Sequence, residues 1–521
     1  MILEHIPFEQ THVFSKLFLD YINQYSELQD WHQDIYPTLE NIKKNSSQKV
    51  ISSTTGKQLV SILSDQYKNH IPKLNVEKNI KLLGQENTFT ITTGHQLNLC
   101  TGPVFFIYKL ITTLNLCTKL KEKFPSYNFV PIYWMASEDH DKEEINHFNL
   151  FGKKYTWETN QEGPVGQFHL HGIEKIWENA PDFPLFIKKI YTESPSLSHA
   201  THALVHHLFG DQGLVVINPD DSNLKKIALP ILEQELTQSS SFNLIQHTSS
   251  ALEKKGYKLQ LHPREINLFY ISSYGRQRIA KENNTFKIID TPLVFTPSEI
   301  REELNNYPER FSPNAALRPI YQETLLPNIA YVAGPAEIAY WLQLKDVFKA
   351  YGLRHPLLIP RQSALYISPA QNDKLKKLEL TIADLFLSKD DLKNKYMASQ
   401  AQYVFDSTVQ KNQIQEAINE LTRKATIVDI SLEGMVQAEY QSIKKSIEHI
   451  EKKIKKAIEQ KEEKTIQQLF NLKDKLFPEG HLQERYDNVL NFYINNPSFI
   501  QELIRLLDPL DFRFVIIREE R

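Results

Sequence analysis

The pattern of apolar and polar positions between residues 88 and 147 predicts a strand, a helix and a second strand. β-Branched and aromatic residues alternate over 88–92, as in a buried strand. Apolar residues then recur at every third or fourth position from Val104 to Leu114, which is one face of a helix. A second apolar strand is predicted over 129–135. The stretch is therefore predicted to form a βαβ unit, in which ligands bind beyond the carboxyl ends of the strands.

The same order of strand, Gly-Pro and helix returns later in the chain. Residues 329–332 are predicted to be a strand, and Gly334 with its following proline precedes a helical pattern. Gly102 and its proline take the corresponding place in the first unit, where the helix is predicted to start at 101–103 with a cap from Thr101 or Gly102. A further strand is predicted over 357–359. The fold class predicted from these patterns is α/β.

The segments around these blocks divide the chain. Residues 1–87 are predicted to be a helical layer, and 88–371 a mixed core with insertions at about 148–213 and 257–300. In the first insertion 148–157 and 163–170 are predicted to be short strands. In the second, 259–261 is predicted to pair with 268–271, before a β-hairpin over 274–290.

The composition changes at about residue 372, where Lys, Glu, Gln and Leu take over and glycine becomes scarce. Apolar residues from Val436 to Ala457 alternate spacings of four and three, which is a heptad pattern. We predict a helical hairpin over 372–476 that dimerises through this stripe, with a solvated two-helix arm as the alternative. Residues 477–521 are predicted to return to the core, with a last strand over 512–517.

Charge and cysteine content restrict the class of protein. The net charge of −3 over 521 residues gives no basic field for nucleic acid. Cys100 and Cys117 are too few for a disulfide framework and fit a reducing cytosol. The N-terminus lacks the regions of a signal peptide, and no run of about 18 apolar residues predicts a membrane span. We expect a cytoplasmic protein without nucleic-acid or membrane partners.

The loop after the first strand is a candidate anion site. It carries Gly94, His95 and Gln96, and the predicted helix start at Thr101 and Gly102 follows. Backbone N–H groups at a helix start attract anions, and glycine lets a ligand approach. A histidine and a hydroxyl beside them could contact phosphate. A tight structural turn is the alternative, because the loop is neither a Walker loop nor a GxGxxG motif.

Four ionisable residues, Glu138, Asp139, His140 and Asp141, follow the second strand. Glu143, Glu144 and His147 come next, and if 139–147 is a helix, Asp139 and Glu143 share a face, as do Glu143 and His147. Such a cluster could bind a divalent cation or an amine, or act as a general base. Acidic residues also favour helix N-termini, but four ionisable residues exceed the needs of a cap, which favours a functional role.

A third set of candidates lies near the later strands. An arginine in a half-buried position usually pairs with a carboxylate of the protein or of a ligand. The set suits a substrate with carboxylate or phosphate groups, although each member alone is more often structural. Its members are Arg318, Gln322, Gly334, Glu337, Tyr340 and Arg361. Cys100, without a paired ligand spacing, does not predict zinc, and no metal site is predicted.

Two blocks of the sequence resemble a known family. They are TTGHQLNLCTGPVFFIYKLIT with PIYWMASEDHDKEEINH, and LRPIYQETLLPNIAYVAGPAEIAYWLQL. They are similar to the signature regions of the bacillithiol-biosynthesis cysteine-adding enzymes, the BshC family, and the similarity runs along the whole chain. His95 stands where that family usually has glutamine, and Cys100 is not one of its fixed features.

The resemblance implies a Rossmann-like core related to nucleotidylyltransferases and class I aminoacyl-tRNA synthetases, and a coiled coil that forms a homodimer. It also implies an amide-forming ligase that joins cysteine to the amine of glucosaminyl-malate. ATP or another nucleotide, with or without magnesium, would activate the cysteine carboxylate.

This implied reaction gives the candidate residues hypothetical roles. The 94–103 loop would hold phosphates, with charge stabilised by His95 and Thr101. Glu138, Asp139 or His140 would bind the amine and remove its proton, while Arg318 or Arg361 would bind the malyl carboxylates. The alternatives are a metal-dependent hydrolase that uses the acidic cluster, and a coiled-coil assembly protein without catalysis.

Overall fold

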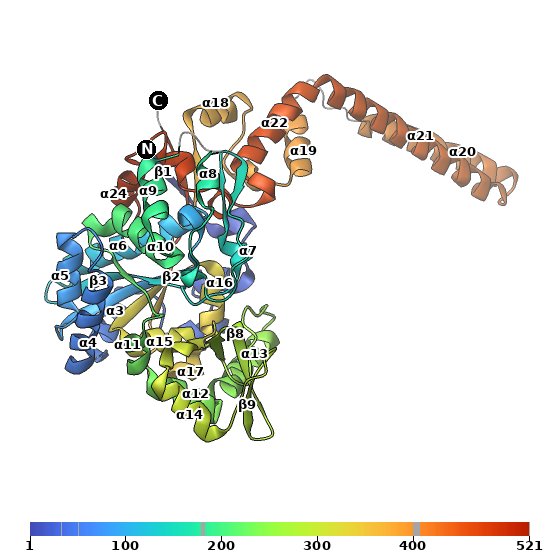
Figure 1. Cartoon of the computed structure of the whole chain (residues 1–521). Helices are drawn as coiled ribbons and strands as arrows, with labels where there is room; N and C mark the ends of the chain where they lie inside the picture. Colours follow the sequence, from blue (N-terminus) through green and yellow to red (C-terminus); the bar gives the residue numbers. More distant parts are fainter. Residues whose placement is uncertain (33, 50–51, 179–182, 400–406, 520–521) are drawn as a thin grey trace. The chain divides into compact units, whose positions relative to one another are not determined.

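The structure is a computed structural model that describes residues 1–32, 34–49, 52–178, 183–399 and 407–519 (Figure 1). The described residues form two compact units. The first comprises Met1–Tyr366 and His481–Ile517, and the second comprises Ile367–Gly480 with the last residues from Arg518.

The first unit is built on a parallel sheet with the strand order β13-β12-β2-β3-β6. Helix α6, Phe105–Lys123, connects β2 to β3 and packs on the sheet. The predicted βαβ unit and the α/β fold class are therefore confirmed. The strands are β2 Thr88–His95, β3 Asn128–Met135, β6 Val215–Ile217, β12 Asn328–Ala333 and β13 Leu357–Pro360.

Strand β2 is buried on both faces although half of its residues are threonines. The hydroxyls of Thr90 and Thr92 donate to Oδ1 of Asn328 in β12, at 3.2 and 2.8 Å. On the other face Phe89 and Ile91 belong to an apolar cluster with the second half of α6. A buried polar group is tolerated where it is hydrogen-bonded, which explains why this strand can lie at the centre of the sheet.

Helix α6 begins later than the sequence predicted. Cys100, Thr101 and Gly102 have φ values of 51°, 76° and 61°, so three consecutive residues are left-handed. This backbone cannot continue into a right-handed helix, and α6 starts only at Phe105, with Val104 in the cap position and no side-chain cap. The predicted caps at Thr101 and Gly102 are therefore wrong.

The first insertion contains less β-structure than predicted. A hairpin of β4, His147–Leu150, and β5, Lys153–Thr156, occupies the first predicted strand region. The strand predicted over 163–170 is wrong, because this stretch forms a short 3-10 turn at Val165–Gln167. A Cβ at Gly166 would lie 2.7 Å from the backbone oxygen of Ser137, so the stretch packs closely on the residues after β3. The helices that follow are α8 Glu174–Glu178, α9 Leu185–Glu193 and α10 Leu197–Phe209.

The second insertion forms an antiparallel sheet with the order β10-β9-β8-β7-β11. The predicted hairpin is confirmed as β8 and β9. The predicted strand at 259–261 is wrong, because the amides of Gln260 and Leu261 donate instead to Oε1 of Gln343, at 3.2 and 3.0 Å. The strands are β7 Leu268–Ser272, β8 Gly275–Glu282, β9 Thr285–Ile288, β10 Val294–Phe295 and β11 Phe311–Pro313.

Helices surround these sheets. In the N-terminal layer they are α1 Lys16–Ile22, α2 Gln29–His32, α3 Leu39–Gln48, α4 Ser53–Gln66 and α5 Leu74–Leu82. Around the second insertion they are α11 Ser222–Ile227, α12 Leu229–Gln238, α13 Ser240–Lys254 and α14 Pro297–Asn306. Beside the later strands they are α15 Arg318–Leu325, α16 Pro335–Leu342 and α17 Lys345–Ala350.

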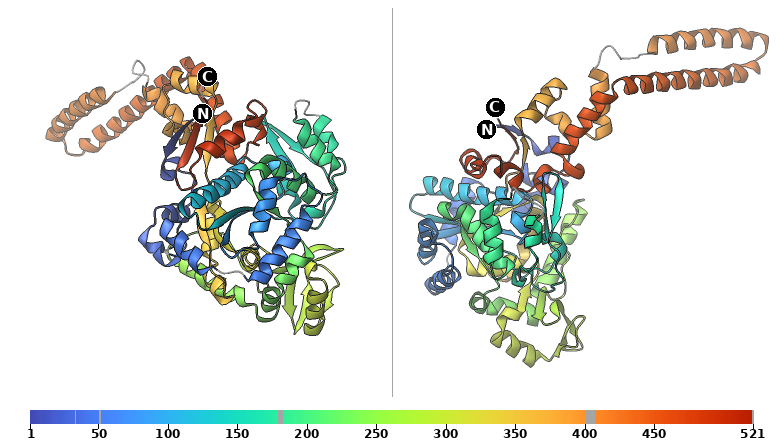
Figure 2. Two further views of the ribbon diagram at one scale, coloured as in Figure 1. Left: turned by 90° about the vertical axis from the view of Figure 1, so that its left-hand side faces the viewer. Right: turned by 45° about the horizontal axis from the view of Figure 1, so that its top comes forward.

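The two ends of the chain meet in a small sheet with the order β1-β15-β14 (Figures 1 and 2). β1, Ile2–Ile6, is a strand within the layer that was predicted to be helical. β15, Phe514–Arg518, confirms the predicted last strand, and it pairs with β14, Ala364–Ile367, outside the central sheet. The chain reaches it through α23, Leu490–Tyr493, and α24, Phe499–Leu506.

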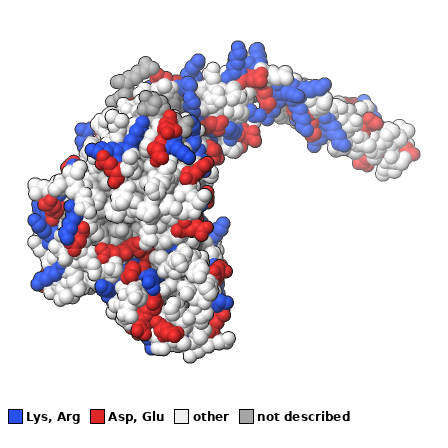
Figure 3. All heavy atoms as spheres, in the orientation of Figure 1, with Lys and Arg blue, Asp and Glu red and all other residues white. Residues whose placement is uncertain are grey.

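The second unit contains the predicted helical hairpin. Its long helices are α20, Thr408–Val428, and α21, Leu432–Lys461, which pack on each other. Charged side chains of both signs lie along the hairpin (Figure 3). The other helices of this unit are α18 Pro369–Lys377, α19 Lys389–Ser399 and α22 Glu463–Leu476. Among the described residues, none of the helices combines the length and apolar character needed to cross a membrane.

Candidate functional site

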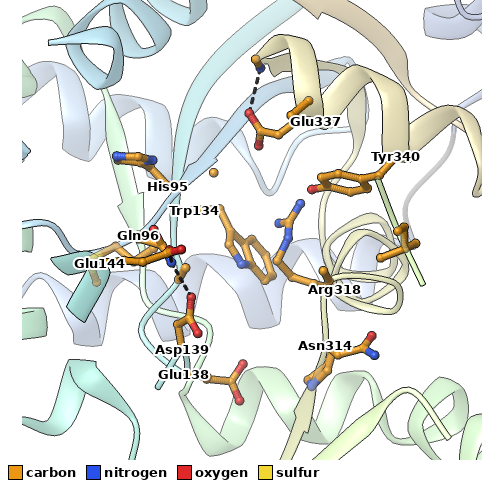
Figure 4. Close-up of a pocket in the computed structure, with 18 of the residues that line it drawn as sticks. His95, Gln96, Trp134, Glu138, Asp139, Glu144, Asn314, Arg318, Glu337 and Tyr340 are labelled. Carbon is orange, nitrogen blue, oxygen red and sulfur yellow. Dashed lines mark hydrogen bonds between the residues drawn. The ribbon is translucent and has the colours of Figure 1, made fainter. Parts of the chain in front are cut away.

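A cavity of about 850 Å³ lies where the strands of the parallel sheet end. Residues after β2, β3 and β12 line it (Figure 4). Residues after β6 and β13, residues of the second insertion and Arg485 of the C-terminal return complete it. This volume is typical of a pocket for a small-molecule ligand. Its position agrees with the rule that parallel sheets bind ligands at the carboxyl ends of their strands.

The cavity brings together most, but not all, of the candidates named from the sequence. The candidates that line it are Gly94, His95, Gln96, Glu138, Asp139, Arg318, Gly334, Glu337, Tyr340 and Arg361. The candidates that are not among its described lining residues are Thr101, Gly102, His140, Asp141 and Gln322.

The turn before α6 is held by the C-terminal return and does not reach the cavity. Nδ2 of Asn488 donates to the carbonyls of Cys100 and Gly102, each at 2.7 Å. The amide of Val104 donates to the carbonyl of Asp487 at 2.8 Å, so this N–H group is already used. Thr101 and Gly102 therefore lie in a turn that the C-terminal return binds, and they are not among the described lining residues of the cavity.

His95 ends β2 and is a neutral imidazole. Its ring stacks on Phe106, with the centroids 4.7 Å apart, and Figure 4 shows it turned away from Arg318. Burial, with a smaller contribution from the charges of Lys109 and Arg361, holds the pKa of His95 well below its usual value. Its Nε2 is buried and has no hydrogen-bond partner among the described residues.

Glu337 makes internal contacts with all of its carboxylate. Lys109 of α6 pairs with it at 2.6 Å, the amide of Gly334 donates to it at 2.8 Å, and so does the hydroxyl of Tyr331 at 2.8 Å. Burial alone raises the pKa of Glu337, but Lys109 and these hydrogen bonds outweigh it and lower the pKa. Glu337 thus holds the start of α16 in place and neutralises Lys109.

The helix over 139–147 that the sequence analysis considered is present only in part. Only α7, Lys142–Ile145, is helical, and His147 already begins β4. Residues 138–141 come before this helix and therefore do not share one helical face. Glu138 forms an ion pair with Lys225 of α11, whose side chain is completely buried. A buried lysine needs such a partner, so Glu138 is committed to the protein itself.

Asp139 forms an acidic corner of the cavity with Gln96 and Glu144. Nε2 of Gln96 donates to both carboxylates, at 2.8 Å to Asp139 and 2.6 Å to Glu144 (Figure 4). Burial alone raises the pKa of Asp139, but contacts with His140 and Gln96 and the charge of Arg276 outweigh it and hold this pKa well below its usual range. Asp139 is therefore a carboxylate in the folded protein. Glu144 belongs to the acidic cluster that the sequence shows after the second strand, although it was not among the site residues predicted from it.

His140 and Asp141 lie beside this corner. Nη1 of Arg276 is 3.1 Å from Nδ1 of His140. Arginine can only donate, so Nδ1 accepts, and a neutral His140 carries its proton on Nε2. This tautomer has no free nitrogen to accept a proton, which argues against His140 as the base. Asp141 is exposed and its side chain does not cap α7.

A basic wall faces the cavity from α15 and β8. Arg318, the first residue of α15, donates to Gln322 at 3.1 Å and to the hydroxyl of Tyr331 at 3.4 Å. Among the described residues, no carboxylate oxygen lies within 4.0 Å of a guanidinium nitrogen of Arg318, so no ion pair is formed. Gln322 thus orients Arg318 from behind, and Tyr340 lies beside it (Figure 4). An arginine without a carboxylate partner is ready to bind an anion.

Arg276 of β8 is the second part of this wall, and the sequence did not single it out. It is 8% exposed, donates to Ser312 and Pro313 at 2.9 and 3.0 Å, and stacks on Phe269 at 3.9 Å. The sequence shows basic residues alternating along β8, but nothing in this pattern predicts that the hairpin lies above the core. Other lining residues that sequence reasoning missed are Lys109, Arg264, Arg278 and Arg485.

Arg361 follows β13 and is buried, at 3% exposure. It pairs with Glu484 at 2.7 Å and donates to the carbonyl of Gln362 and to Ser363, at 2.8 and 3.0 Å. Much of its guanidinium is therefore already bound by the protein, which makes it a weaker candidate than Arg318 for the malyl carboxylates.

The two cysteines are free and buried. In the part of the chain that the structure describes, no three His, Cys, Asp or Glu side chains are grouped so that they could hold a metal ion. The acidic residues after β3 instead contact Lys225 and Gln96.

Comparison with known proteins shows the family of the chain. The family model for the N-terminal Rossmann-like domain of bacillithiol biosynthesis BshC matches residues 1–362, and that for the C-terminal coiled-coil domain matches 364–519. A relative from Cytophaga hutchinsonii is 42% identical over 513 residues, covering 98% of both chains. One from Flavobacterium johnsoniae is 39% identical over 525 residues, covering 98% of this chain and 99% of its own. Both relatives carry the name "Putative cysteine ligase BshC". The chain therefore belongs to the BshC family of bacillithiol biosynthesis, with a Rossmann-like core and a coiled-coil domain.

Proposed function

We propose that this protein is the cysteine ligase of bacillithiol biosynthesis, which forms an amide between the carboxyl carbon of L-cysteine and the amine of glucosaminyl-malate. One observation carries the proposal beyond family membership. The cavity combines an acidic corner, Asp139 and Glu144, with a basic wall, Arg276 and Arg318. Glucosaminyl-malate has the complementary charges, an ammonium group at one end and two carboxylates at the other.

The acidic corner is proposed to bind the amine. Because the pKa of Asp139 is low, this carboxylate is a strong partner for an ammonium group and a weak base. The amine must lose a proton before it attacks a carbonyl carbon. We assign this proton to Glu144, which shares the Gln96 amide with Asp139 and is exposed to solvent. Glu138 is not proposed as the base, because it is paired with Lys225.

The basic wall is proposed to bind the malyl carboxylates. A guanidinium and a carboxylate form two parallel hydrogen bonds, and such bonds are stronger than those between neutral groups. Arg318 has no carboxylate partner in the described protein and is already oriented by Gln322. Arg276 already donates to Ser312, to the carbonyl of Pro313 and to His140, so its proposed role is to add positive charge to the wall rather than to form paired hydrogen bonds. Both groups would be in place before the substrate arrives.

Cysteine's carboxylate needs activation, because a carboxylate is a poor electrophile at neutral pH. Adenylation by ATP, with magnesium on its phosphates, would supply a leaving group. A Rossmann-like domain is a common nucleotide-binding fold, which supports nucleotide use. The turn at Thr101 and Gly102 is not proposed to hold the phosphates, because Asn488 and Asp487 already occupy it.

The test is turnover by purified protein supplied with cysteine and glucosaminyl-malate, with and without ATP and magnesium. Bacillithiol, followed by mass spectrometry, is expected only in the presence of nucleotide. Production of AMP would support an adenylate, and production of ADP an acyl phosphate. Absence of bacillithiol under all conditions, with a correctly folded sample, would contradict the proposal.

We also propose that the protein is a homodimer through α21, and that it works in the cytoplasm. None of the residues of α21, all of which are described, is buried within one chain. Ile443 and Ile450, two residues of the predicted heptad stripe, are 36% and 53% exposed. A long exposed apolar stripe favours self-association. The buried free thiols of Cys100 and Cys117 fit a reducing compartment.

A further inference from the structure

Two guanidinium groups lie over one aromatic ring at the edge of the cavity. Phe105, the first residue of α6, has the guanidinium carbon of Arg361 4.9 Å from its ring centroid and that of Arg485 5.6 Å away. Arg361 follows β13, whereas Arg485 belongs to the C-terminal return, and both line the cavity. Two cations are thus brought together from segments more than a hundred residues apart.

The charges around Phe105 do not balance. Glu484 pairs with Arg361 at 2.7 Å, and its other oxygen accepts the amide of Ala364 at 2.9 Å. Arg485 has no carboxylate within ion-pair distance in the described part of the chain. One carboxylate therefore faces two guanidinium groups, and their mutual repulsion lowers the pKa of Arg485 further than burial does alone. An anion between them would relieve this repulsion.

One donor of this pair is also unused. Nε of Arg361 is buried and has no hydrogen-bond partner among the described residues. Buried donors are nearly always satisfied, so an open one indicates a missing acceptor. There is space beside it, because Gly334 has no side chain, and a Cβ there would lie 3.6 Å from this Nε.

We propose that Nε of Arg361 and the guanidinium of Arg485 form an oxyanion subsite beside Phe105, separate from the basic wall at Arg318. The subsite takes a phosphate group of the activating nucleotide or a carboxylate of a substrate, since both present oxygens that accept from two arginines. The proposal rests on the proposed ligation, which needs both kinds of anion in one cavity. Glu484 is the positioning residue that holds Arg361 in place.

Two variants test the subsite. Arg485→Gln removes an exposed cation and leaves the pair between Arg361 and Glu484 intact. Arg361→Lys retains a cation for Glu484 but removes Nε. Arg513→Gln is the matched control, because this exposed arginine pairs with Asp511 and does not line the cavity.

The readout is binding of inorganic pyrophosphate and of malate to the full-length protein, measured by calorimetry without turnover. Both variants are expected to bind one of these anions about tenfold or more weakly than the wild type, whereas the control is expected to bind both with wild-type affinity. Loss of pyrophosphate binding identifies nucleotide phosphate as the occupant, and loss of malate binding identifies a carboxylate. Wild-type affinity of both variants for both anions, or no binding of either anion by the wild type, would overturn the subsite.

The same data separate this proposal from the ligase proposal. If the variants lose anion binding but the protein makes no bacillithiol, the subsite is supported and the proposed reaction is rejected. Bacillithiol formation with unchanged anion binding in both variants would retain the reaction and reject the subsite.

Discussion

Arg361 and Glu484 form a buried ion pair 2.7 Å long that ties the residue after β13 to the C-terminal return. Their side chains are 1% and 0% exposed. The C-terminal return follows the coiled-coil domain in the chain, and this pair holds it against the end of the parallel sheet. The same return supplies Asn488 to the turn before α6 and Arg485 to the cavity. The site is therefore completed by the last tenth of the sequence.

Replacing Glu484 with glutamine is expected to destabilise the first unit strongly. The change leaves Arg361 buried without a counter-charge, which typically costs about 3–5 kcal/mol. The loss in the free energy of unfolding is measured by urea titration, with a spectroscopic signal from the first unit as the probe. Glu86→Gln, in an exposed loop, is the control and is expected to change little. Equal midpoints for the two variants would show that the pair contributes no stability.

Replacing Arg318 with glutamine is expected to raise the KM for glucosaminyl-malate about 10- to 100-fold, because it removes a charged hydrogen bond to the malyl group. The KM for cysteine is expected to stay close to that of the wild type. Steady-state kinetics with each substrate varied in turn provides the measurement. Arg318→Lys keeps the charge but cannot form two parallel hydrogen bonds. Its KM for glucosaminyl-malate is expected to lie between those of the wild type and of Arg318→Gln. A rise in the KM for cysteine alone would reassign Arg318.

The pH dependence of stability should report on Asp220. Burial, and then the charge of Glu138, raise the pKa of Asp220 to about 7. A carboxyl group whose pKa is raised on folding favours the folded state while it is protonated. Its contribution is full below the unfolded pKa of about 3.9 and is lost as the pH rises to 7.

Asp220→Asn, which cannot ionise, removes this dependence. Its melting temperature is expected to exceed that of the wild type at pH 8, with a gap that narrows towards pH 5. Thermal unfolding across this range provides the test, and Asp290→Asn, on an exposed turn, serves as the control. A constant gap at all pH values would mean that Asp220 does not titrate in this range.

The double variant Ile443→Lys, Ile450→Lys is expected to be a monomer. Charges in the exposed apolar stripe of α21 would oppose close packing of two copies. Light scattering of the intact protein gives the mass, and Lys444→Gln with Lys453→Gln is the control on the same helix. A monomeric wild type, or a dimer that survives the double substitution, would contradict the proposed interface.

The sequence predicted the features that depend on local periodicity. The apolar alternation of β2 and β3, the helical spacing of α6 and the heptads of α21 are properties of short stretches, and the structure confirms each of them. The second Gly-Pro block, at Gly334, also begins a helix as predicted.

The contacts that the sequence did not predict are those made by residues far apart in the chain. Nothing near Thr101 shows that Asn488 binds the carbonyls of its turn. Likewise, Glu138 forms its ion pair with Lys225, which is almost ninety residues away in the sequence. Arg276 and Arg485 line the cavity only because an insertion and the C-terminal return fold over the sheet. The sequence shows which residues are acidic or basic, but it does not show which residues they contact in the fold.

The measurement that tests the ligase proposal most directly uses cysteine labelled with heavy oxygen in its carboxylate, incubated with glucosaminyl-malate, ATP and the purified protein. Amide formation transfers one carboxylate oxygen to the leaving group and keeps the other in the product. We expect bacillithiol with one heavy oxygen, and the second heavy oxygen in AMP. Bacillithiol without any label in AMP or phosphate, or no bacillithiol at all, would contradict ligation through an activated cysteine.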